Sequence, residues 1–149
     1  MAAVTVKGAD SVIKSLRKFG ADVEEQVKGI IEDTATNIEI KAIRNKGAKL
    51  SFIRIDKLIL DEGWRAVIGP QGDNLLAVYF EFGTGLSAKQ ILSPYPESVK
   101  KLARQYFITG RGTLRGRPYL FPAYFEESRK FVRELQKMLD KESNKFNKQ

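Results

Sequence analysis

The residue best placed to do chemistry is Glu81, a single carboxylate within the largely apolar run of residues 75–85. A buried carboxylate with a raised pKa can act as a general acid or base. The chain has no histidine to share that task, and no second acid lies near Glu81 in the sequence. The alternative is a structural Glu81, whose carboxylate pairs with an arginine or with backbone donors of the following turn. We favour the structural role.

The residues after Glu81 resemble a nucleotide-binding turn. Residues 83–88 match the G-x-G-x-x-A fingerprint of dinucleotide sites. That fingerprint also needs a helix, a second parallel strand and an acidic residue about 20 positions further on. Here Pro94 and Pro96 cut the helix short, and residues 98–108 contain no Asp or Glu. We expect no cofactor, and a chain without cysteine or histidine lacks the commonest metal ligands.

A third feature is the basic segment 86–118, which holds seven Lys or Arg residues and one acidic residue. Residues 1–85, in contrast, carry twelve basic and twelve acidic residues. Basic and aromatic side chains interleaved in this way could bind nucleic-acid phosphates and stack on bases. A solvated loop, or one that folds against an acidic partner protein, explains the pattern equally well. The candidate interface residues are Lys100, Lys101, Arg104, Arg111, Arg115 and Arg117.

The elements that must position these residues include a central strand. β-Branched and aromatic residues favour a strand over residues 75–82, and its two apolar faces place it in the middle of a sheet. Gly83 and Gly85 then end the strand in a tight turn, where a positive φ is expected. Further strands are predicted near residues 5–8, within residues 49–60, and over residues 64–68.

Helices account for most of the remaining chain. Apolar spacing predicts a helix over residues 10–20, a longer one over 22–44 that stops at 45–47, and a short one over 97–107. The last helix should have Pro122 in its first turn and end near residue 139, before a polar tail at 141–149 that frays. The fold class is therefore α+β: an antiparallel meander sheet packed against a long N-terminal helix and a C-terminal helix.

The domain organisation follows from length and composition. We expect one domain over residues 1–149, with residues 86–118 forming a long basic loop or insertion that is mobile at least over 110–117. The N-terminus lacks the pattern of a signal peptide, and no apolar stretch approaches the roughly 20 residues of a membrane helix. The expectation is a protein made in a cytoplasm that does not enter a membrane.

Two short motifs resemble a known family. The first motif, residues 79–84, is an aromatic-rich segment that ends in Glu-aromatic-Gly-Thr, and the second motif, residues 117–123, is a Pro-aromatic-Leu-x-Pro-Ala start to the last helix. With the Thr-Val-Lys-Gly-Ala-Asp segment at residues 5–10, they resemble the gene-product-ten-like morphogenesis family of tailed phages and prophages. The motif residues are Tyr79, Glu81, Phe82, Gly83, Thr84, Pro118, Tyr119, Leu120, Pro122 and Ala123.

The resemblance implies a minor virion protein of the neck or tail, similar to lambda-type tail-completion proteins. Such a protein acts at the head–tail joint without enzymatic activity, and forms a homo-oligomeric ring with a hexamer as one candidate. Its partners would be other neck and tail proteins, and it would be found in the virion and, during assembly, in the host cytoplasm. The alternative is a cytoplasmic nucleic-acid-binding protein that uses the basic segment.

Overall fold

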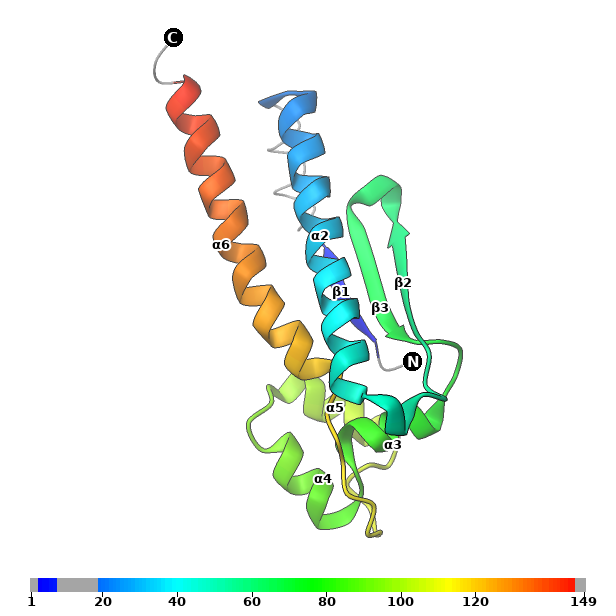
Figure 1. Ribbon diagram of the computed structural model, residues 1–149. Helices are drawn as coiled ribbons and strands as arrows, with labels where there is room; N and C mark the ends of the chain where they lie inside the picture. The colour runs from blue at the N-terminus through cyan, green and yellow to red at the C-terminus, as the bar shows by residue number, and fades with distance from the viewer. Residues whose placement is uncertain (1–2, 8–18, 147–149) are drawn as a thin grey trace.

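A computed structural model describes residues 3–7 and 19–146, and its architecture confirms the α+β class (Figure 1). A three-stranded antiparallel sheet packs against the long helix α2, which in turn packs against the long helix α6. The helix predicted over residues 10–20 lies mostly outside the described residues. The elements are β1 (Val4–Lys7), α2 (Ala21–Lys46), η2 (Ala48–Leu50), β2 (Ile55–Leu60), η3 (Asp61–Gly63), β3 (Arg65–Pro70), α3 (Leu75–Phe82), α4 (Gly85–Leu92), α5 (Glu97–Gln105) and α6 (Phe121–Phe146).

The sheet has the order β1-β3-β2, so β3 is the central strand. Ala66 and Ile68 of β3 are fully buried on the face that α2 covers. On the opposite face Val67 pairs with Thr5 of β1 and with Leu58 of β2, and Leu58 is 55% exposed. Alternate residues of a strand point to opposite faces, so one face builds the core and the other stays open.

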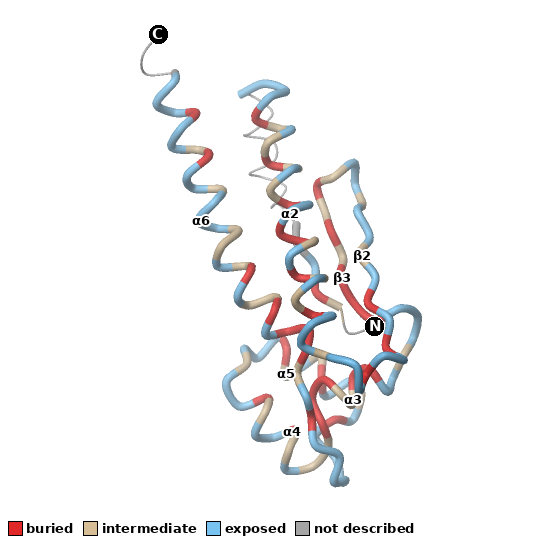
Figure 2. The backbone as a smooth tube through the Cα atoms, viewed as in Figure 1, coloured by how far each residue is buried: buried red, intermediate tan, exposed pale blue. Residues whose placement is uncertain are grey.

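Helix α2 occupies nearly the range that its apolar spacing predicts. Its buried residues recur every three or four positions, as a helix packed on one side requires. It ends at Gly47, whose φ of 61° suits glycine at a helix C-terminus. Figure 1 shows α2 between the sheet and α6, and Figure 2 shows buried positions along α2 and β3 and at the start of α6, whereas the far half of α6 is mostly exposed.

The predicted central strand at residues 75–82 is wrong, because this segment is helix α3. Asn74 caps the helix by accepting a 3.2 Å hydrogen bond from the Ala77 amide. The buried side chains of α3 recur with helical rather than alternating spacing, so its apolar residues split between a buried and an exposed face. They are Ala77, Val78, Glu81 and Phe82, whereas Leu75 and Leu76 are exposed.

The basic segment 86–118 is not one long loop. It contains most of α4 and all of α5, the latter close to the predicted short helix, and its residues 93–96 and 106–118 lie outside helices and strands. These parts form, with α3, a small helical lobe at the base of the long helices (Figure 1). Helix α6 continues to Phe146, past the expected end near residue 139, so most of the tail predicted to fray is helical.

Candidate functional site

The centre of the site is the Glu81 carboxylate, which joins the first motif to the second. It accepts hydrogen bonds from the backbone amides of Tyr119 at 2.8 Å, Leu120 at 3.0 Å and Phe121 at 3.0 Å. Glu81 is thus paired with backbone donors, one of the two kinds of partner expected for a structural carboxylate, but these donors belong to a remote segment and not to the adjacent turn. Two motifs that are far apart in sequence form one structural unit.

The local chemistry explains why a carboxylate stands at this position. Helix α6 begins at Phe121, and the first amides of a helix have no partners within it. These amides and the helix dipole favour a negative group at the N-terminus. Helix α3 places Glu81 on its buried face, with only 3% of the residue exposed, where it meets the first amide of α6, that of Phe121, and the two amides just before the helix. Glu81 therefore caps α6 from another element of the fold.

Burial has a marked effect on the ionisation of Glu81. Desolvation raises the pKa of Glu81 to about 7, although the hydrogen bonds from Leu120, Tyr119 and Phe121 oppose that rise. Burial, together with the neighbouring Glu81 carboxylate, also raises the pKa values of Tyr95 and Tyr119. The space around Glu81 is too small to admit a water molecule. This carboxylate therefore combines a raised pKa with an enclosed position.

Tyr119 of the second motif is fixed from several sides. Its hydroxyl donates a 3.1 Å hydrogen bond to the Ala77 carbonyl, and its own carbonyl accepts one of 3.2 Å from the Asn45 amide side chain. The residue is 1% exposed. Tyr79 of the first motif likewise donates through its hydroxyl to the Tyr106 carbonyl, at 3.3 Å. The two motif tyrosines therefore fasten α3 to the segments around it.

The glycine turn of the first motif packs against the segment that precedes α6. Gly83 and Gly85 have φ values of 75° and 59°, so the positive φ expected at one or the other of these glycines is found at both. Thr84 donates its amide to the Leu114 carbonyl and accepts the Leu114 amide on its hydroxyl, each at 2.9 Å. Gly116 donates to the Ser87 hydroxyl at 3.0 Å. Leu114 and Gly116, which lie within the residues 110–117 expected to be mobile, therefore have specific backbone contacts within the chain.

An aromatic cluster surrounds this motif unit. Phe82 of the first motif lies 5.4 Å from Phe121 and 6.4 Å from Tyr95, measured between ring centroids, and Phe125 lies 5.4 Å from Tyr95. Pairs at such distances add to the stability that their burial provides. The cluster joins α3 and α6 to the turn before α5, so the motifs contribute a large part of the core of the lobe.

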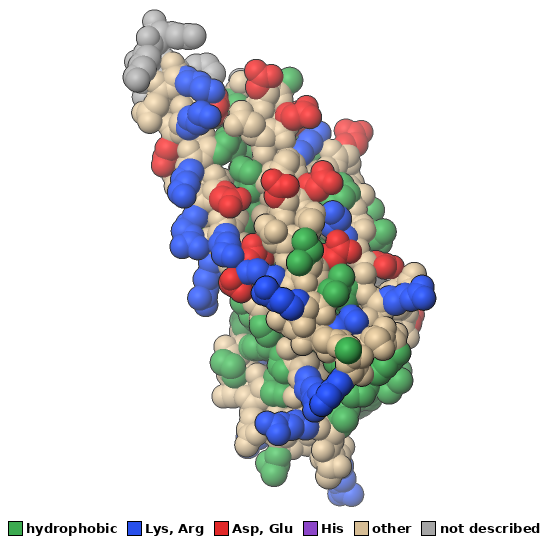
Figure 3. All heavy atoms as spheres, in the orientation of Figure 1, with side chains coloured by type: hydrophobic (Ala, Val, Ile, Leu, Met, Phe, Trp, Pro, Cys, Tyr) green, Lys and Arg blue, Asp and Glu red, His purple; other side chains and the backbone are tan. Residues whose placement is uncertain are grey.

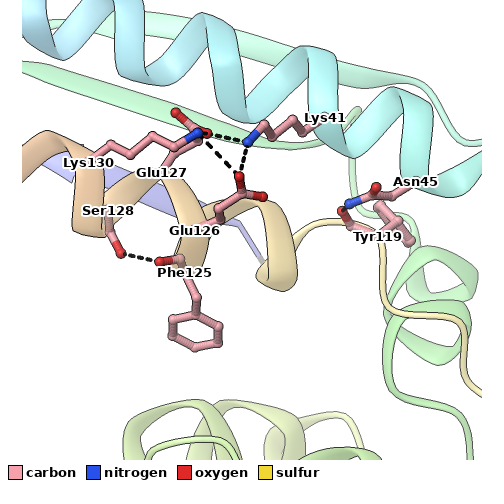
Figure 4. A network of polar contacts seen from close by, with 8 residues as sticks. All are labelled: Lys41, Asn45, Tyr119, Phe125, Glu126, Glu127, Ser128 and Lys130. Atoms are coloured by element: carbon pink, nitrogen blue, oxygen red, sulfur yellow. Dashed lines mark hydrogen bonds and ion pairs between the residues drawn. The ribbon is translucent and has the colours of Figure 1, made fainter.

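A charged network fastens the next turn of α6 to α2 (Figure 4). Lys41 of α2 pairs with both Glu126 and Glu127 of α6, and Lys130 pairs with Glu127 at 2.8 Å. The Glu127 side chain is only 3% exposed. Its burial is outweighed by the hydrogen bonds from Lys130 and Lys41, so the pKa of Glu127 is lowered. This network holds the two long helices in register above the motif unit.

The candidate interface residues separate into two groups. Lys100 and Arg104 of α5 line a cleft of about 660 Å³ between α4 and α5. Lys89 of α4 also lines the cleft, but it is not among the candidate interface residues predicted from the sequence. It is a single lysine with no basic neighbour in the sequence, and it joins Lys100 and Arg104 only because α4 and α5 face each other in the fold. The remaining residues are exposed and do not line this cleft; they are Lys101, Arg111, Arg115 and Arg117.

Comparisons with protein-family models, curated proteins and solved structures found no match for this chain. Within residues 3–7 and 19–146, no cluster of three His, Cys, Asp or Glu side chains is arranged to hold a metal ion. No helix in the described part of the chain combines the length and apolar character needed to cross a membrane. The geometry of the motif unit and the basic cleft therefore carries the functional argument.

Proposed function

We propose that this chain is a structural protein of a phage neck or tail, a tail-completion or head–tail joining protomer that assembles into a homo-oligomeric ring. The observation that carries this proposal is the contact between Glu81 and the Tyr119, Leu120 and Phe121 amides. The two motifs that resemble the phage morphogenesis family meet there in one buried unit. A shared unit of this kind makes the resemblance more specific than two separate short motifs.

The environment of Glu81 supports a structural role over an enzymatic one. All three of its hydrogen bonds come from backbone amides, and no water-sized space adjoins its carboxylate. A general acid or base must reach the proton that it transfers, within hydrogen-bonding distance of a substrate. A carboxylate enclosed in this way instead determines the position of α6 relative to α3.

The exposed apolar side chains support assembly. Leu86 in α4 is 78% exposed and Phe107 after α5 is 83% exposed. Ile40 on α2 and Leu76 on α3 are also more than half exposed. Apolar groups on several sides of a protomer suit heterologous contacts, in which one surface of a subunit meets a different surface of the next. Such contacts close into rings when the rotation between subunits allows it.

The test is to examine the purified protein by negative-stain electron microscopy and to measure its mass in solution over a range of concentrations. Closed rings of uniform size are expected, together with binding to phage heads or tails that lack their completion protein. A protein that stays monomeric at every concentration and does not bind those particles would contradict the proposal.

A second candidate function is nucleic-acid binding. It is favoured by Arg111, Arg115 and Arg117, which are exposed and form no ion pair within the described part of the chain. If these arginines contact phosphates, the logarithm of the DNA association constant should fall with the logarithm of salt concentration, by about 0.9 per contact for duplex DNA. Weak binding with no such slope would exclude this candidate.

A further inference from the structure

The cleft between α4 and α5 has the features of a docking site for an acidic segment. Lys89, Lys100 and Arg104 line it, and Glu97 is the only described residue that pairs with any of them, with nitrogen–oxygen distances of 3.2 Å to Lys100 and 3.8 Å to Arg104. Lys89 forms no ion pair with another described residue. The cleft therefore keeps an uncompensated positive charge in a concave site, where an anionic ligand is attracted most strongly.

The lining of the cleft also has an apolar part. Leu86 and Leu92 contribute to it, and Leu86 is 78% exposed. A site for a free anion does not need such a side chain, because small anions are held by donors and charge alone. A cleft with both cations and exposed leucine suits a protein segment that carries carboxylates next to apolar side chains.

The chain itself has a segment of that kind on the outer face of α2. Glu25, Glu32 and Glu39 are spaced seven residues apart, so they follow one side of the helix at intervals of about 10 Å. Asp22 and Asp33 lie beside them on the same outward side. Figure 3 shows acidic side chains gathered over the upper part of the molecule, and basic ones at the lower lobe and along α6.

The carboxylates of this acidic stripe (Asp22, Glu25, Glu32, Asp33 and Glu39) have no cationic partner among the described residues. Apolar side chains continue the stripe toward the end of α2, where Ile40 is 56% and Ile43 is 45% exposed. The stripe thus offers the complement of the cleft: negative charge next to exposed aliphatic groups. Both surfaces belong to the same chain but lie on different elements.

We infer that the acidic stripe of α2 in one protomer docks into the basic cleft between α4 and α5 of the next. This inference rests on the proposed ring, for which it identifies the two contacting surfaces. The contact is heterologous, because the two surfaces differ, and it can therefore repeat from subunit to subunit. Opposite charges across it set the orientation and speed the encounter, while Ile40 and Leu86 supply apolar area.

The experiment uses two triple variants and a matched control. The cleft variant is K89E/K100E/R104E, and the stripe variant is E25K/E32K/E39K. The control, R129E/R133E/K137E, reverses three exposed basic residues of α6 that have no ion pair in the described structure and changes the net charge as much as the cleft variant does. Oligomer mass is measured by sedimentation at low and high salt, with circular dichroism to verify folding.

The cleft and stripe variants are each expected to weaken assembly at least about tenfold, and the control should assemble like the natural protein. An equimolar mixture of the two variants should assemble beyond a dimer, because the natural stripe meets the natural cleft and the reversed stripe meets the reversed cleft, so every contact joins opposite charges. The chain that carries all six reversals should form rings again. If the cleft variant does not fold, K89Q/K100Q/R104Q replaces it and should give a smaller loss in the same direction.

The outcomes separate this inference from the proposed function. If both triple variants form rings as the natural protein does, the docking inference is overturned while the ring proposal stands. If the natural protein forms open filaments that the variants abolish, the docking inference stands and the closed ring does not. If the cleft variant keeps its rings but loses single-stranded DNA binding, the cleft is a nucleic-acid site and the inference is overturned. A natural protein that remains monomeric contradicts both.

Discussion

Gly83 and Gly116 approach each other more closely than any other residue type would allow. A Cβ atom on Gly83 would lie 2.4 Å from the Gly116 amide nitrogen, and one on Gly116 would lie 2.6 Å from the Gly83 amide nitrogen. The first motif and the segment leading into the second therefore pack backbone against backbone. This close contact accompanies the Glu81 cap and brings the start of α6 against the end of α3.

The first prediction concerns Gly83→Ala. The substitution should lower the free energy of unfolding by about 1–3 kcal/mol, since it places a Cβ against backbone atoms at a φ of 75°. Gly29→Ala is the control, because Gly29 lies inside α2 with nothing within 4 Å of its Cβ position. It should stabilise the protein by up to about 1 kcal/mol. Equal effects in denaturant titrations would contradict the close contact.

The error at residues 75–82 shows what the sequence could not settle. A short run that is apolar at nearly every position has no clear period, so a strand and a buried helix give the same pattern. The strand was predicted because these residue types have a high strand propensity. In the structure, the Asn74 cap and the packing of Phe82 against Phe121 stabilise a helix instead. Longer segments such as α2 and α6 repeat their apolar spacing over many turns, so they could be predicted.

The site was predictable in part. A glutamate just before a glycine turn indicated a carboxylate paired with an arginine or with backbone donors, and the glycines of that turn indicated a positive φ at Gly83 or Gly85. The sequence could not indicate that the donors belong to residues 119–121, because that contact depends on how α3 packs against α6. Lys89 was missed for a similar reason, since the basic cleft exists only once α4 and α5 face each other.

The second prediction concerns the pH dependence that Glu81 confers. Its folded-state pKa of about 7 is above its ordinary value of 4.5, so the folded protein binds a proton more tightly than the unfolded chain between these values. The associated stability is fully present below about pH 4.5 and is lost as pH rises through 7, by at most about 3 kcal/mol. Denaturant titrations from pH 5 to pH 8 measure this loss.

The control for this prediction is Glu81→Gln, which removes the ionisable group. The variant should be less stable, because an amide has one acceptor oxygen for three backbone donors, but its stability should not fall over this pH range. The chain has no histidine side chain to titrate in the same range. Equal slopes for the two proteins would show that the three amides keep the carboxylate ionised throughout.

The third prediction separates two neighbouring aromatic residues of α3. Phe82 is fully buried and contacts Phe121 and Tyr95, whereas Phe80 is half-buried and contacts the exposed Phe52. Phe82→Ala should lower the free energy of unfolding by about 3–5 kcal/mol, and Phe80→Ala by clearly less. In the strand that the sequence predicted, both side chains would share one face. Similar losses in urea titrations would therefore favour the strand.

The fourth prediction concerns the charged network between α2 and α6. Lys41→Met should lower the free energy of unfolding by about 1–3 kcal/mol, because the buried Glu127 then keeps Lys130 as its only cationic partner among the described residues. Glu126→Gln should have a smaller effect, since 57% of that side chain is exposed. Lys137→Met, at an exposed position of α6, should change stability by less than about 0.5 kcal/mol. Thermal unfolding of the three variants tests this order.

The fifth prediction concerns amide hydrogen exchange in residues 110–117. The amides of Leu114, Gly116 and Arg117 donate hydrogen bonds to Thr84, Ser87 and Phe80, at 2.9, 3.0 and 2.7 Å. These three amides should exchange more slowly than those of Arg111 and Thr113, for which the structure records no acceptor within the described residues. Uniformly fast exchange of all these amides would contradict this prediction and support the mobile loop over residues 110–117 that was expected from the sequence.

A pair of substitutions at Thr84 tests the cause of that protection. Thr84→Val removes the hydroxyl that accepts the Leu114 amide but keeps the shape of the side chain, so exchange at Leu114 should accelerate. Thr84→Ser retains the hydroxyl and should retain most of the protection. The Arg117 amide donates to the Phe80 carbonyl and should respond little to either change. If Val and Ser have the same effect at Leu114, its protection comes from burial of the backbone and not from the Thr84 hydroxyl.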